Sequence, residues 1–68
     1  MIQSAYKGVE IEMEMHQQAH DRWKCDYTLI RHPGGIRTLH HGETEFPTLD
    51  LAREHALQEA RHAIDQAS

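Results

Sequence analysis

Apolar side chains alternate with charged or polar ones within residues 6–16, most regularly from Val9 on, and this limits the possible folds more than any other feature. The apolar parity consists of Val9, Ile11, Met13 and Met15. A period of two is typical of a β-strand, whereas the apolar stripe of a helix recurs every three to four residues. Glutamate and methionine favour helices, but this alternation fits a helical stripe poorly. We therefore predict a strand over residues 6–16, with Glu10, Glu12 and Glu14 facing solvent.

A second alternation predicts another strand over residues 23–32, rich in the aromatic and β-branched types that suit a pleated surface. Its inward parity consists of Trp23, Cys25, Tyr27 and Leu29. Pro33-Gly34-Gly35 should end the strand in a hairpin turn, because proline lacks a backbone donor and glycine suits tight turns. A third strand is predicted over residues 36–42, and its register stays open because each parity carries one aliphatic side chain. The stretch 17–22 has no apolar period and is predicted to be a connection.

The segment from residue 49 to about residue 66 has the pattern of a helix and contains neither glycine nor proline. Small and aliphatic side chains recur in it at steps of three and four, at Leu49, Ala52, Ala56, Ala60, Ala63 and Ile64. Thr48 suits the N-cap, and Asp50 places a carboxylate near the positive end of the helix. We expect Phe46 to anchor the start of this helix, and the alanines to let it lie close to a sheet.

Together these elements predict a single α+β domain over residues 1–68: a three-stranded antiparallel β-meander with one C-terminal helix packed on one face. The other face would carry charged and polar side chains together with Ile30, and its edge strands would have no partner. A chain of 68 residues builds only a small core, and its one cysteine cannot form an internal disulfide. A small core and free edges favour association with another chain.

Composition argues against several classes of protein. No run of residues is apolar and long enough for a membrane span, and the first residues lack the basic and apolar regions of a signal peptide. With a single cysteine, we expect a cytoplasmic protein that does not bind membranes. The chain is histidine-rich, with seven histidines, and their full protonation would move the formal charge from -4 to +3.

Three short motifs carry a resemblance to known proteins: Tyr6-Lys7-Gly8-Val9 at the start, Trp23 at the second predicted strand, and Phe46-Pro47-Thr48 before the helix. In these motifs the chain resembles a group of short, uncharacterised bacterial proteins of unknown function. The likeness covers nearly the whole chain. It implies a bacterial β-β-β-α protein and supplies no activity.

Two of these motifs, at residues 6–9 and 46–48, are also similar to the DNA-binding domain of plant ethylene-response factors and the related N-terminal domains of phage-type integrases. Those domains lay a three-stranded sheet in the major groove and present arginines and tryptophans to DNA. Here the outward parity of the first predicted strand carries glutamates, which repel phosphate. A nucleic-acid-binding module that uses the sheet and nearby basic residues stays as the alternative function. Its candidate contacts are Lys7, Arg31, Arg37 and the histidines.

The histidines suggest metal binding, but their spacing does not support it. The closest pairs are His40 with His41, His16 with His20, and His55 with His62. The first pair would point to opposite faces of a strand, the second spans a strand end and a loop, and the third lies about 10 Å apart along a helix. Since no established zinc-ligand spacing occurs, we expect no metal or cofactor, and histidine-mediated metal binding is a third hypothesis.

Cys25 is the one candidate nucleophile, and it shares parity with core residues, where a thiol is inert. No third group completes a catalytic arrangement, so we expect no enzyme activity. The leading hypothesis is a small non-enzymatic domain that acts by association, as a homodimer or with a small protein partner, through the uncovered sheet face or an edge strand. The predicted interface residues are Trp23, Lys24, Ile30 and Leu39.

Overall fold

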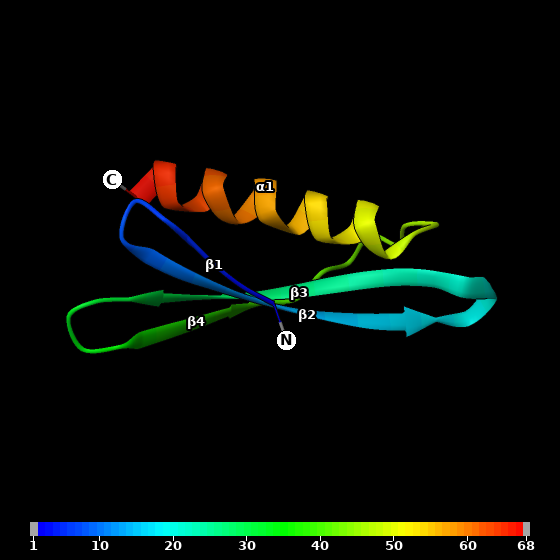
Figure 1. Ribbon diagram of the computed structural model, residues 1–68, viewed down its shortest axis with the longest axis horizontal. Helices are drawn as coiled ribbons and strands as arrows, with labels where there is room; N and C mark the ends of the chain where they lie inside the picture. Colours follow the sequence, from blue (N-terminus) through cyan, green and yellow to red (C-terminus); the bar gives the residue numbers. More distant parts are fainter. Residues whose placement is uncertain (1, 68) are drawn as a thin grey trace.

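Four antiparallel strands and one helix make up the fold (Figure 1). The computed structural model describes residues 2–67. The elements are β1 (Ile2–Tyr6), β2 (Val9–Gln18), β3 (Arg22–Arg31), β4 (Ile36–His40) and α1 (Leu49–Ala67). The strands form one sheet in the order β1-β2-β3-β4, and α1 lies along one face of it. The α+β class, the antiparallel sheet and the C-terminal helix are confirmed, whereas the predicted number of strands is wrong.

The strand that the prediction missed is β1. The predicted strand over residues 6–16 contains the end of β1, a turn and most of β2. Lys7 and Gly8 form the turn, with φ values of 50° and 79°, and Tyr6 lies opposite Val9. Positive φ at both central residues is typical of the two-residue hairpin turn that matches strand twist, and glycine is favoured there. A Lys-Gly pair between two strand-like segments was therefore the signal for an extra hairpin.

The β2–β3 hairpin is longer than predicted. Residues 17–22, predicted as a connection, extend both strands: β2 continues to Gln18, and β3 begins at Arg22. A single 3₁₀ turn over Ala19–Asp21 joins them, with His20 and Asp21 at positive φ. Backbone pairing here needs no apolar side chains, because this end of the hairpin reaches past the helix into solvent (Figure 1).

The structure fixes the register of β4, which the sequence leaves open. Tyr27 pairs with His40, and Thr28 pairs with Leu39, after a turn that contains the predicted Pro33-Gly34-Gly35. Tyr27 belongs to the core under α1, so Ile36, Thr38 and His40 face the helix side of the sheet. Arg37 and Leu39 therefore lie on the opposite face, called the open face below.

The core lies between α1 and the two central strands, which are the strands that α1 mainly contacts. Its buried residues are Ile11, Met13, Cys25, Tyr27, Leu29, Ala52, Ala56, Ala60 and Ile64. The alanines bring the helix axis close to the sheet, as the stripe predicts. Thr48 caps α1, since its Oγ1 accepts the backbone N–H of Leu51 at 3.2 Å. No helix in the described part of the chain has the length and apolar character needed to span a membrane.

Candidate interaction surface

Two ion pairs between charged side chains lie on the open face. Glu12 of β2 forms an ion pair with Arg37 of β4. Glu10 pairs with His32, whose Nε2 lies 2.7 Å from a carboxylate oxygen. The Glu12 and Arg37 side chains therefore lie across β3, the strand between them, whereas the second pair joins β2 to the turn after β3. Glu10, Glu12 and Glu14 lie on one face, as predicted, but the Glu12 side chain is only 15% exposed and does not face solvent as expected.

Ile30 is the main correction to the predicted interface. Its side chain is on the open face, as predicted, but it is only 5% exposed. Its direct neighbours across the sheet are Glu10 and Arg37. Arg37 reaches across β3 to Glu12, and Glu10 pairs with His32, two residues after Ile30. Aliphatic stems of charged side chains cover apolar surface well. They account for the burial of Ile30, which lies on the face of the sheet away from α1. Ile30 therefore offers no free apolar surface to a partner.

Trp23 lies on the inward side of the sheet, as its parity predicts, and its role as an interface residue stays a prediction. It packs against the core on the helix side, half-buried. Its backbone exchanges two hydrogen bonds of 2.8 Å with Phe46, which confirms Phe46 as the anchor before the helix. Trp23 thus fixes the segment that leads into α1. Lys24 lies opposite His16 on the open face, half-buried at the far end of the β2–β3 hairpin.

The free apolar surface gathers on β4. Ile36 is 64% exposed and Leu39 is 56% exposed, and these are two of the three large apolar side chains exposed among residues 3–67. The third, Leu51, lies in the first turn of α1. β4 is also an edge strand, so one side of its backbone has no neighbouring strand in the sheet. Of the predicted interface residues, Leu39 is exposed on this strand, and Ile36, which the sequence analysis did not single out, is exposed beside it.

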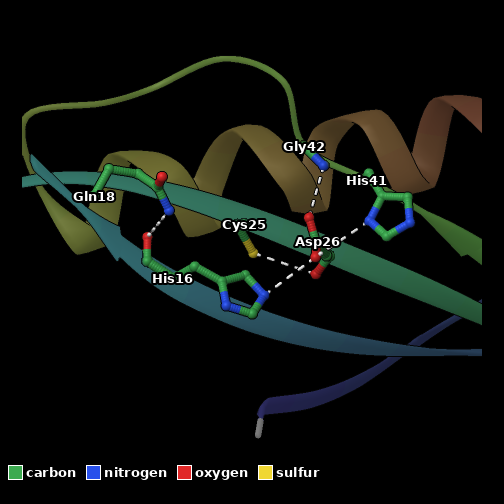
Figure 2. A network of polar contacts seen from close by, with 6 residues as sticks. All are labelled: His16, Gln18, Cys25, Asp26, His41 and Gly42. Carbon is green, nitrogen blue, oxygen red and sulfur yellow. Dashed lines mark hydrogen bonds and ion pairs between the residues drawn. The ribbon is translucent and has the colours of Figure 1, made fainter.

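A polar cluster around Asp26 ties the end of β4 to the sheet (Figure 2). The backbone N–H of Gly42 donates to Asp26 Oδ1 at 2.8 Å. Asp26 Oδ2 lies 3.1 Å from His16 Nε2 and 3.5 Å from His41 Nδ1. Glu14, another carboxylate, is directly opposite Asp26 in the β2–β3 register. The two histidines and the Gly42 N–H therefore offset a like-charge pair that would otherwise destabilise the sheet.

These contacts set the ionisation of Asp26. Partial burial acts to raise the pKa of this carboxyl, but the hydrogen bond from Gly42, followed by the effects of His16 and His41, outweighs it and holds the pKa below its usual value.

The cluster also requires glycine at position 42. A Cβ atom on Gly42 would lie 2.2 Å from the backbone oxygen of Cys25, so only glycine lets the chain pass this close to β3.

Two hollows border this part of the sheet. One, of about 330 Å³, lies on the open face and is lined by Glu12, Met13, Glu14, Asp26, Thr28, Arg37 and Leu39. The other, of about 430 Å³, lies beside α1 and is lined by Tyr27, His55, Gln58, Glu59, His62 and Ala63. The His40 ring stacks on Tyr27, with the ring centres 4.7 Å apart, next to the second hollow. The first hollow is therefore lined in part by Arg37 and Leu39 of β4. The second is lined by Tyr27, on which His40 of β4 stacks.

The histidines occupy separate environments. His40 stacks on Tyr27 while His41 contacts Asp26, so this adjacent pair points to opposite faces as predicted. His55 lies 3.3 Å from Glu59 and against the ring of Phe46. Within residues 2–67, no group of three or more histidine, cysteine, aspartate or glutamate side chains is placed to hold a metal ion.

The remaining candidate residues also have defined places. Cys25 is buried, as predicted, and burial raises the pKa of its thiol, which favours the unreactive protonated form. The candidate nucleic-acid contacts Lys7 and Arg37 are paired with Asp65 and Glu12 respectively. The Lys7–Asp65 pair, at 2.6 Å, joins the β1–β2 turn to the last turns of α1. Comparison with protein-family models, curated proteins and solved structures found no significant match.

Proposed function

We propose that this chain is a small non-enzymatic module that acts by association, and that its partner is a second copy of itself docked on the outer edge of β4. The observation that carries the proposal is the coincidence of two properties on one strand. β4 has an unpaired backbone edge, and it bears the exposed side chains of Ile36 and Leu39. Unprotected edges of this kind are templates for pairing with another strand.

The way proteins shield free edges supports this choice of surface. Edge strands that do not pair with another chain usually carry prolines, bulges or inward-pointing charges, which prevent such pairing. The single charged residue of β4 is Arg37. Its side chain extends over the open face to Glu12 of β2, away from the free edge of β4. The opposite edge strand, β1, ends in a tight turn whose Lys7 is tied to Asp65 of the helix. β4 is therefore the better edge for a partner.

The test is the mass in solution of Leu39→Lys beside that of the unchanged chain, by analytical ultracentrifugation from micromolar to submillimolar concentrations. The unchanged chain should form a dimer, and Leu39→Lys should stay monomeric because the substitution places a positive charge in an apolar contact on the free edge. Far-ultraviolet circular dichroism should show the same fold for both, since the Leu39 side chain is mostly exposed.

Leu51→Lys is the matched control. Leu51 is 50% exposed, close to the value for Leu39, but it lies on α1 away from the β4 edge. This variant should dimerise like the unchanged chain. A monomeric unchanged chain at every concentration would reject the proposal, and so would equal weakening by both substitutions, because general loss of surface hydrophobicity would then explain the effect.

A further inference from the structure

We infer that the two copies pair through β4 in antiparallel register about a two-fold axis at Thr38, so that two four-stranded sheets join into one continuous sheet. The inference rests on the proposed function and specifies its geometry. A two-fold axis is the usual symmetry of a homodimer, and it brings the same surface of each copy against the other. For two antiparallel edge strands this axis stands perpendicular to the sheet, so both helices lie on one side.

The parity of β4 restricts the possible registers. Directly opposed residues of an antiparallel pair point to the same face of the sheet. Ile36, Thr38 and His40 face the helix side, while Arg37 and Leu39 face the open side. A symmetric pair must therefore be centred on a residue of the strand, and each choice gives a different set of neighbours across the axis.

A centre at Thr38 uses the whole strand. β4 has five residues, and Thr38 is the middle one, so every residue gains a partner. Ile36 then lies opposite His40 of the second copy, Arg37 lies opposite Leu39, and Thr38 lies opposite itself. A centre at Arg37 or at Leu39 leaves part of each strand unpaired. The centre at Arg37 would also place two guanidinium groups face to face, which is unfavourable.

The side chains brought together in this register are compatible. On the helix side, Ile36 meets His40 of the second copy, a ring already stacked on Tyr27 at an interplanar angle of 11°. On the open side, Leu39 meets the aliphatic stem of Arg37 of the second copy. Leu39 lines the hollow that also contains Glu12, Glu14 and Asp26. A second guanidinium at the rim of this acidic hollow complements its charge.

Cysteine cross-linking tests the register. Thr38→Cys places two thiols directly opposite each other at the axis, where the two Cα atoms are about 4.5–5.5 Å apart, within the range that a disulfide spans. Leu39→Cys and Arg37→Cys place their thiols on diagonal positions, with the Cα atoms about 7–8 Å apart, beyond that range. Under mild oxidation, Thr38→Cys should form a reducible covalent dimer at least about tenfold faster than either of the other variants.

The unchanged chain is the control, because its one cysteine, Cys25, is buried and should give no covalent dimer. Thr38 is exposed, so the substitution should not disturb the fold. Faster cross-linking of Leu39→Cys or Arg37→Cys would overturn the register. A non-covalent dimer whose Thr38→Cys variant does not cross-link would also overturn it, while leaving self-association intact. If no variant cross-links and the unchanged chain is monomeric, the proposed function fails as well.

Discussion

Asp26 shows how a single residue organises the end of the sheet. Its carboxylate binds the Gly42 N–H and two imidazoles, one from β2 and one from the segment after β4. These partners, His16, His41 and Gly42, lie 10 to 16 residues from Asp26 along the chain. The cluster therefore depends on the strand register, and no local sequence pattern indicates it. By contrast, the buried thiol of Cys25 follows directly from strand parity.

Asp26→Asn should lower the free energy of unfolding by about 1–3 kcal/mol at neutral pH, the usual cost of losing a charged hydrogen-bonded partner. The pKa of this carboxyl is depressed in the folded chain below its ordinary value of 3.8. Its stabilising contribution is therefore present above pH 3.8 and is lost as the pH falls through the folded pKa. Urea unfolding of both proteins should show their difference shrinking in this acidic range.

Asp26→Ala is the companion variant, because alanine also removes the oxygen that accepts the Gly42 N–H. It should be less stable than Asp26→Asn at every pH. A difference between the unchanged chain and Asp26→Asn that stays constant from neutral pH to below pH 3.8 would contradict the assigned role of the carboxylate charge.

At the scale of elements, periodicity predicts most of the fold. The alternation in β2 and β3 and the three-to-four-residue steps of α1 reflect burial against one another, and these elements lie where the sequence places them. β1 was missed because its five residues have no strong alternation and its turn, Lys7-Gly8, lies inside an apparent strand. The register of β4 was not predictable, because it depends on the length of the turn after β3.

Burial of Ile30 was not predictable either, since its cover comes from ion pairs between distant residues. Glu10 with His32 and Glu12 with Arg37 bridge positions 22 and 25 residues apart. Periodicity assigns a residue to a face of the sheet, and it gives no information on how long polar side chains arrange themselves there. For the same reason Ile30 was predicted to be exposed although the structure buries it, and the exposed side chain of Ile36 was not predicted.

Ile30→Val should therefore affect stability rather than association. Removing one methylene from a buried position costs about 0.5–1.5 kcal/mol. The measurement is urea unfolding at a concentration where the chain is monomeric. Ile36→Val, the same change at a position that is 64% exposed, should leave the stability within about 0.5 kcal/mol of the unchanged chain. Equal effects of the two substitutions would show that the open face does not bury Ile30.

At the scale of the whole molecule, the helix and the ion pairs cover different parts of the sheet. α1 mainly covers β2 and β3 on one side of the sheet. On the other side, the paired side chains of Glu12 and Arg37 lie over β3. β4 lies at the edge of the sheet, beside the part that the helix covers (Figure 1). Its large apolar side chains, Ile36 and Leu39, are exposed. The proposed self-association depends on this strand.

Amide hydrogen exchange of the unchanged chain, measured as a function of protein concentration, tests that dependence most directly. Pairing with a second copy should protect the outward-facing amides of β4, within Ile36–His40, increasingly as the concentration rises. The amides of β1, the other edge strand, should exchange at the same rate throughout. Exchange in β4 that does not change while the chain dimerises, or protection that appears in β1 instead, would contradict β4 as the site of association.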